Sequence, residues 1–186
     1  MNDIKMRLDK VRALIQEQEF LEGKGLSNEV NIRIFCYEPE NEMVVRHFVN
    51  QLETDQSLNC HLIVCNLYKT FLSICDDMDI TDVIPDMEEA DGSDYLLEQL
   101  NSAIGNREFI DKIQYEPHEP GDVLMLTGVG EVFPFMRIHT LLEALQPYFS
   151  NVPILVMYPG EFDGRHVKLF NRLTPNDYYR AFNVID

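Results

Sequence analysis

The fold is decided by residues 121–160, GDVLMLTGVGEVFPFMRIHTLLEALQPYFSNVPILVMYPG. Two short apolar runs, Val123–Leu126 and Val152–Met157, lie near the ends of this stretch. Between them, apolar residues recur at three- and four-residue spacing, which is the pattern of one buried helix face. The glycine-bearing segments Gly128-Val129-Gly130 and Pro159-Gly160 predict a turn after each run. This order is typical of a βαβ unit, and apolar runs without alternation indicate parallel strands covered on both faces.

The rest of the chain extends this unit into an alternation of strands and helices. We therefore predict an α/β fold, a single three-layer domain over residues 1–186 with a mainly parallel sheet of four to five strands and helices on both faces. A helix at about 3–22 precedes a core of about 30–186 that resembles a Rossmann-like or degenerate P-loop-type core. The predicted strands are 31–36, 61–65, 123–126, 153–158 and a closing or edge segment at 179–184, and the predicted helices include 41–52, 67–74, 95–104, 109–113 and a last helix or turn at 167–173.

The chain is acidic, with 32 Asp and Glu against 15 Lys and Arg and a formal net charge of -17. This balance argues against direct binding of nucleic acid, because neutralising phosphates requires clustered Lys and Arg. It is compatible with docking onto a basic protein, and equally with a role in solubility alone. The N-terminus, MNDIKMRLDKVRALI, is charged throughout, and no apolar run approaches the roughly 20 residues of a membrane span. We therefore expect a cytoplasmic protein without a membrane segment.

The four cysteines predict buried, reduced thiols rather than a metal site. None of Cys36, Cys60, Cys65 and Cys75 forms a CxxC pair, and a zinc site would need ligand pairs at short spacing. Reduced thiols are the ordinary state of a cytosolic protein. We expect no metal and no cofactor.

The first predicted strand lacks a phosphate-binding loop. It is followed by Tyr37–Glu42, YEPENE, which has neither GxxxxGK[ST] nor GxGxxG, and its carboxylates would repel a phosphate. The later Gly128-Val129-Gly130 lacks the third glycine of a dinucleotide fingerprint. Both glycines are interpreted as turn formers that permit positive φ, and Pro134 fits the first turn of the next helix.

The loop at 159–166 combines carboxylates, a base and a cation beyond a predicted strand. Glu161 or Asp163 could form an acid–base pair with His166, but no Ser or Cys nucleophile lies nearby. The favoured interpretation is a hydrogen-bonded loop that presents Arg165. Paired tyrosines farther along the chain have a composition typical of interface hot spots. The predicted partner-binding residues are Glu131, Arg137, Glu161, Asp163, Arg165, His166, Tyr178, Tyr179 and Arg180; no catalytic residue is predicted.

Four stretches together resemble the BrxB family of bacterial BREX (bacteriophage exclusion) defence systems, and they cover nearly the whole chain. Their combination in this order is specific, although no single stretch is. The stretches are GLSNEVNIRIFCYEPENEMVVRHFV at 25–49, LTGVGEVFPFMRIHTLLEALQP at 126–147, VPILVMYPGEFDGRHVKLF at 152–170 and NDYYRAFNVI at 176–185.

The resemblance implies a small cytoplasmic component of a multi-protein antiviral system that modifies host DNA and blocks phage replication. It favours a non-enzymatic structural or adaptor role. The implied partners are other BREX proteins, first the alkaline-phosphatase-like PglZ, then the BREX ATPase or methyltransferase. The alternative is a nucleotide-binding or hydrolytic subunit with an unconventional site at the carboxyl ends of the strands. Direct contact with DNA is a weaker third interpretation, against which the net charge argues.

Overall fold

The computed structural model describes residues 2–23, 31–163, 166–173 and 183–185. Strands and helices alternate along it as predicted. The helices are α1 (Asn2–Leu14), α2 (Gln18–Leu21), α3 (Glu42–Thr54), α4 (Leu67–Asp77), α5 (Ile84–Asp91), α6 (Ser93–Ala103), α7 (Asn106–Ile113), α8 (Val129–Val132) and α9 (Ile138–Leu145), with 3-10 turns η1 (Pro39–Asn41) and η2 (Thr81–Val83). The strands are β1 (Ile32–Tyr37), β2 (His61–Asn66), β3 (Asp122–Thr127), β4 (Ile154–Phe162), β5 (Val167–Leu169) and β6 (Asn183–Ile185).

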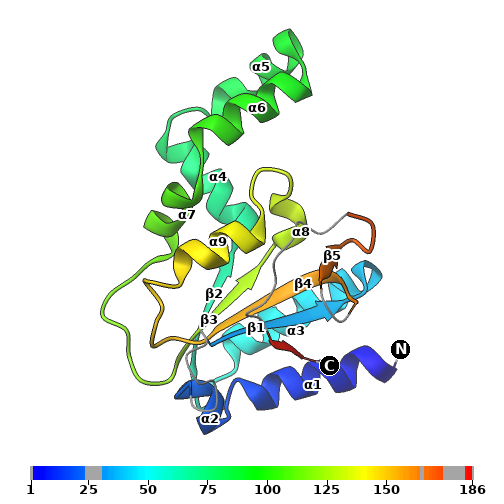
Figure 1. Cartoon of the computed structure of the whole chain (residues 1–186), viewed down its shortest axis with the longest axis vertical. Helices are drawn as coiled ribbons and strands as arrows, with labels where there is room; N and C mark the ends of the chain where they lie inside the picture. The colour runs from blue at the N-terminus through cyan, green and yellow to red at the C-terminus, as the bar shows by residue number, and fades with distance from the viewer. Residues whose placement is uncertain (1, 24–30, 164–165, 174–182, 186) are drawn as a thin grey trace.

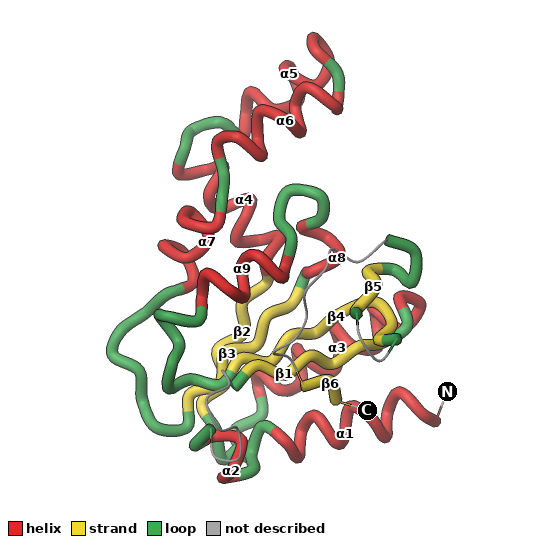
Figure 2. Tube along the Cα trace, in the orientation of Figure 1, coloured by secondary structure: helices red, strands yellow, loops and turns green. Residues whose placement is uncertain are grey.

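The strands form one sheet in the order β2-β3-β4-β1-β6, and all of these neighbours are parallel. β5 is the exception, since it pairs with the end of β4 in antiparallel orientation. Helices α1 and α3 cover one face of the sheet, and α4, α7, α8 and α9 cover the other (Figures 1 and 2). The prediction of an α/β fold with a mainly parallel sheet between helices is therefore confirmed, while the Rossmann-like or P-loop-type resemblance stays a prediction.

Both faces of the central strands are buried, because successive side chains of a strand point to opposite sides. On β1, Ile32 and Ile34 pack toward α4 and α9, whereas Phe35 and Tyr37 pack toward α1 and α3. Continuous apolar runs rather than alternation are required in such a sheet. This explains why the apolar runs of the sequence located the strands well.

Helices α5 and α6 form an arm, residues 81–103 with η2, that extends away from the sheet (Figures 1 and 2). The predicted helix at 95–104 corresponds to α6, and Gly92, with a φ of 86°, separates it from α5. Ile84 and Met87 of α5 are half-buried against the core, whereas Val83 is 44% exposed.

The single predicted helix at 3–22 is wrong in one respect, because it divides into α1 and α2. Glu17 between them has extended backbone, with φ -73° and ψ 130°. The bend lets both Ile15 and Phe20, which are 0% and 3% exposed, reach the same apolar layer. The apolar spacing alone is compatible with one straight helix. The division into α1 and α2 follows from the burial of both Ile15 and Phe20 in the same layer.

The predicted turn at Pro159-Gly160 is also wrong, because β4 runs through both residues to Phe162. Gly160 pairs with Leu169 of β5, in the segment where a last helix or turn was predicted. An added Cβ at Gly160 would lie 2.1 Å from the carbonyl oxygen of Lys168. The glycine is therefore needed for close approach of two strands rather than for a turn.

Two smaller predictions also fail. Pro134 lies in the turn between α8 and α9 and does not start a helix. Gly128 has the predicted positive φ, 71°, but Gly130 lies inside α8. Asn41 precedes α3 without a side-chain capping hydrogen bond, whereas Asn66 caps α4, its side chain accepting from the N–H of Lys69 at 3.0 Å.

Candidate functional site

Three segments meet at the carboxyl ends of the central strands, which is where ligands and partners of open α/β sheets gather. The segment after β1 is joined to the one after β5 by a hydrogen bond from Asn171 Nδ2 to Glu38 Oε2 at 2.7 Å. The segment after β3 packs against the same hairpin, since an added Cβ on Gly130 would lie 2.7 Å from the Phe170 ring and 3.1 Å from Pro159. We call these joined segments, residues 37–46, 128–132 and 159–171 where described, the carboxyl-end rim.

One arginine links two of these segments. The Arg46 guanidinium contacts Glu42 Oε1 and Glu131 Oε1, each at 2.7 Å. The Tyr37 hydroxyl donates to the other oxygen of Glu42 at 2.6 Å. Burial, followed by the Glu42 hydrogen bond, raises the pKa of Tyr37, and the Glu42 hydrogen bond raises the pKa of Arg46. Arg46 therefore stays charged and matched by two carboxylates, which fixes Glu131 beside α3.

A cavity of about 380 Å³ lies next to this cluster, between α3 and the ends of β2 and β3. Gly128 and Asn66 both line this cavity, and they lie so close together that a Cβ added to Gly128 would be 2.7 Å from Asn66 Oδ1. The charged residues of its lining are Glu42, Glu53, Glu131, Arg46 and Lys69. Since Arg46 is already paired with two carboxylates, the lining does not concentrate free positive charge.

The β4–β5 hairpin holds three of the predicted residues in a local network. His166 donates its backbone N–H to Asp163 Oδ1 at 2.8 Å, and its ring Nδ1 lies 3.6 Å from the same oxygen. Lys168 lies 3.4 Å from Glu161 and 3.8 Å from Asp163. These contacts confirm the interpretation of a hydrogen-bonded loop, because the carboxylates are engaged with the turn itself.

The predicted partner-binding residues are thus partly brought together. Glu131, Glu161, Asp163 and His166 all belong to the carboxyl-end rim. Arg137 lies at the start of α9 and lines a different depression, with Asn106 and Thr140 among its neighbours. The remaining predicted residues lie outside the described part of the chain: Arg165, Tyr178, Tyr179 and Arg180.

Sequence reasoning missed the apolar side chains that the rim exposes. Met43 and Val44, at the start of α3, are 71% and 38% exposed, and Phe162, at the end of β4, is 39% exposed. The acidic residues around them dominated the sequence pattern. Large apolar side chains ringed by polar groups are typical of the core of a protein interface.

A second polar cluster lies at the opposite, amino end of the sheet. Asp122 is 2% exposed and accepts hydrogen bonds from Tyr115 Oη at 2.8 Å, the Glu119 N–H at 2.9 Å and His61 Nδ1 at 2.9 Å. Burial alone would raise the pKa of Asp122, but these three hydrogen bonds lower it below its usual value. The cluster ties the starts of β2 and β3 to the 115–119 loop. The signal that could have revealed it is a carboxylate at the head of an apolar run.

Other kinds of site receive no support from the described residues. The four cysteines are free thiols, two of them buried. In residues 2–23, 31–163, 166–173 and 183–185, no group of three His, Cys, Asp or Glu side chains is arranged to hold a metal ion. Over the same residues, every helix is too short or too polar to span a membrane.

Comparison with known proteins places the chain in a family. The sequence model of the family described as "BREX protein BrxB" matches residues 63–184. A protein named BREX protein BrxB from Bacillus cereus (strain H3081.97) is 36% identical over 193 aligned residues, covering 100% of both chains. Another of that name, from Escherichia coli O9:H4 (strain HS), is 27% identical over 187 residues, covering 98% of this chain and 92% of the relative. No solved structure matches the chain. With a matching family model over most of its length and a full-length relative, the chain belongs to the BrxB family of BREX phage-defence systems.

Proposed function

We propose that the chain is a non-enzymatic adaptor of a BREX antiviral defence complex in the cytoplasm. In this role it binds other BREX proteins, PglZ first and then the ATPase or the methyltransferase, and so supports host DNA methylation and phage exclusion. The observation that carries the proposal is the carboxyl-end rim, where exposed Met43 and Phe162 lie among paired polar groups.

The composition of the rim supports binding of a protein rather than a small molecule. Its carboxylates are held in place by Arg46 and Lys168, so they would need little reordering when a partner docks. The exposed methionine and phenylalanine supply the apolar area that such an interface buries. The predicted residues Arg165, Tyr178, Tyr179 and Arg180 are proposed to contribute to partner binding as well.

Replacing both exposed apolar residues with aspartate, Met43→Asp/Phe162→Asp, is expected to weaken binding to PglZ at least about tenfold, because each substitution buries a charge in the interface. Isothermal titration calorimetry with purified PglZ measures the change. The free variant should keep the wild-type circular dichroism spectrum, since both side chains are exposed.

Tyr148→Asp is the matched control. Tyr148 is 47% exposed but follows α9, at the amino end of the sheet. Its substitution should leave the affinity unchanged. Equal affinities for the double variant and the wild type would remove the rim as the docking surface, and binding of no BREX protein to the wild-type chain would overturn the adaptor role.

The cavity beside Arg46 favours a second candidate, a nucleotide-binding or hydrolytic subunit. Its volume, about 380 Å³, lies in the range of small-molecule sites, and it lies at the carboxyl ends of parallel strands. However, Glu42, Glu53 and Glu131 oppose a phosphate group there. We therefore expect no thermal shift with ATP, GTP or NAD in the presence of Mg²⁺. A stabilisation of several degrees that Lys69→Ala abolishes would instead favour the second candidate.

A further inference from the structure

The arm has helix faces that no other part of the described structure covers. α5 buries none of its residues, and α6 buries only Leu96 and Leu100. The two helices pack against each other and extend from the body (Figures 1 and 2). Their outer faces are therefore available to a partner.

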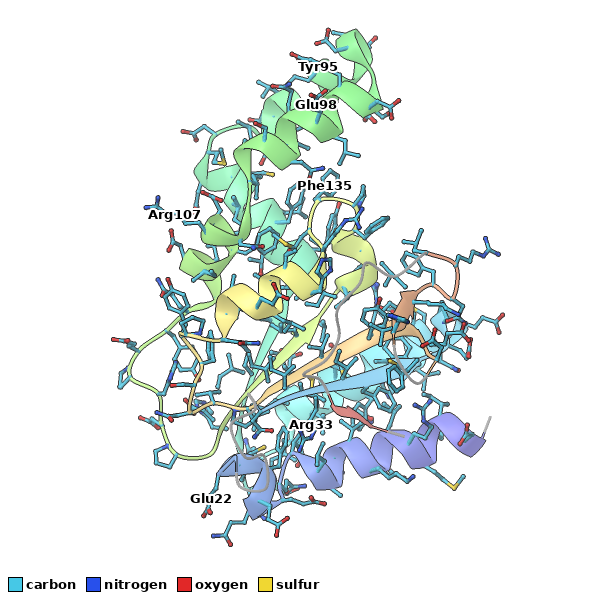
Figure 3. All side chains as sticks on the ribbon, in the orientation of Figure 1. Glu22, Arg33, Tyr95, Glu98, Arg107 and Phe135 are labelled. Atoms are coloured by element: carbon cyan, nitrogen blue, oxygen red, sulfur yellow. The ribbon has the colours of Figure 1, made fainter. Side chains whose placement is uncertain are left out.

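Helix α6 carries an exposed aromatic ring near two exposed carboxylates. Tyr95 is 45% exposed, and Asp94 and Glu98 are also exposed. Glu98 lies three residues after Tyr95 and hence next to it on one side of the helix, near the outer end of the arm (Figure 3). Within the part of the chain that the structure describes, none of these three side chains has a hydrogen-bond, ion-pair or ring partner.

The chemistry of this face selects an arginine. A guanidinium group stacks on an aromatic ring and at the same time pairs with a carboxylate, which an ammonium group does less well. Tyrosine beside carboxylates offers both contacts in one place. Tyrosine and arginine are also, with tryptophan, enriched among interface hot spots.

The charge of the whole arm favours the same occupant. Residues 81–103 contain no Lys, Arg or His. Among the described residues, none of the carboxylates of the arm makes an ion pair with a cation. A basic protein surface would be attracted to this arm, whereas nucleic acid would be repelled. The carboxylates are Asp82, Asp86, Glu88, Glu89, Asp91, Asp94 and Glu98.

We infer that Tyr95, Asp94 and Glu98 form a docking site for an arginine on a basic surface of another BREX protein. This inference rests on the adaptor function proposed above and gives the adaptor a second binding surface. The arm and the carboxyl-end rim arise from different connections of the sheet, after β2 and after β1, β3 and β4 respectively. One chain could therefore join two partners.

The test is calorimetric titration of the wild-type chain and its variants with each purified protein of the same BREX system, at about 50 and 200 mM salt. Tyr95→Ala should weaken binding of one of these proteins about tenfold. Tyr95→Phe should stay within about threefold of the wild type, because the ring is kept. Asp94→Asn/Glu98→Gln should weaken binding at low salt and reduce its salt dependence.

Two controls match these changes. Tyr148→Ala removes a tyrosine of similar exposure from another part of the surface, and Glu17→Gln/Glu19→Gln neutralises two exposed carboxylates outside the arm. Neither should change the affinity or the salt dependence.

The outcomes separate this inference from the proposed function. If every BREX protein that binds the wild type binds the Tyr95→Ala variant equally well, the arm site is overturned and the adaptor role stands. Failure of every BREX protein to bind the wild type overturns both. Sedimentation of the free chain adds a further outcome, since a self-association that Tyr95→Ala abolishes would assign this face to a second copy of the chain instead.

Discussion

Gly160→Ala is expected to destabilise the protein by about 3 kcal/mol. The added methyl group would lie 2.1 Å from the Lys168 carbonyl oxygen and 2.9 Å from the Tyr158 ring. The first of these atoms is backbone in the paired strand, so the clash cannot be relieved by turning a side chain. Separation of β4 from β5 would also disturb Glu161, Asp163 and Lys168, whose contacts depend on the hairpin. Urea unfolding followed by circular dichroism measures the loss.

Gly105→Ala is the control for this prediction. Its nearest atom would be the flexible Glu108 carboxylate at 3.6 Å, and the cost of alanine before α7 should stay below about 1 kcal/mol. If Gly160→Ala and Gly105→Ala unfold at the same urea concentration, the close approach of β4 and β5 described above is wrong.

Asp122→Asn is expected to cost about 2 kcal/mol at neutral pH. The amide keeps the shape of the side chain but replaces one of the two acceptor oxygens with a donor and removes the charge that strengthens the hydrogen bonds from Tyr115, Glu119 and His61. Chemical denaturation at pH 7 measures this difference. Asp111→Asn, an exposed carboxylate on α7, should change stability by less than about 0.5 kcal/mol.

The pH dependence of the Asp122→Asn effect follows from the direction of the pKa shift. The hydrogen bonds hold the pKa of Asp122 below its value in the unfolded chain. A lowered pKa contributes stability that is complete above the unfolded pKa, about 4, and is lost as the pH falls through the folded pKa. The stability difference between wild type and Asp122→Asn should therefore persist from about pH 7 to 5 and shrink below about pH 4. A difference that grows as the pH falls below about 4 would contradict the assigned hydrogen bonds.

The stability effect of Asp122→Asn lies away from the surfaces proposed for partners, and this separation is useful experimentally. Asp122 lies at the amino end of the sheet, whereas Met43 and Phe162 belong to the carboxyl-end rim. A loss of binding by the rim variant without a loss of stability would thus report on docking alone. Asp122→Asn is the complementary control: it should be less stable than the wild type. At a temperature where it is folded, it should bind the partner with the wild-type affinity.

Much of the secondary structure was predictable because the central strands β1, β3 and β4 are buried on both faces. Runs such as Val123–Leu126 are too short for a helix and too apolar for an edge strand, and they were located to within a few residues. The capping of α4 by Asn66 was likewise predictable, since a cap is a contact between neighbours in sequence. The β4–β5 hairpin at Gly160 was not predictable, because a glycine in the sequence indicates a tight turn and a close approach of two strands equally well.

The candidate site was predictable only where its members are close in sequence. Glu161, Asp163 and His166 share one loop, and their hydrogen bonds formed as expected. The pairing of Arg46 with Glu131 joins segments that are distant in the chain, and no local pattern marks it. The exposure of Met43 was not predictable from sequence either. An apolar residue at the start of an amphipathic helix is usually assigned to the buried face of that helix.

The sequence by itself determined that this is an α/β protein with parallel strands, an acidic surface and no ordinary phosphate-binding loop. These properties depend on side-chain type and on spacing over a few residues, which sequence shows directly. Only the tertiary structure decided the strand order β2-β3-β4-β1-β6, the antiparallel β5 and the projection of α5 and α6. Each of these depends on which distant segments pack together, and the free energy of that choice is spread over many contacts that no local pattern records.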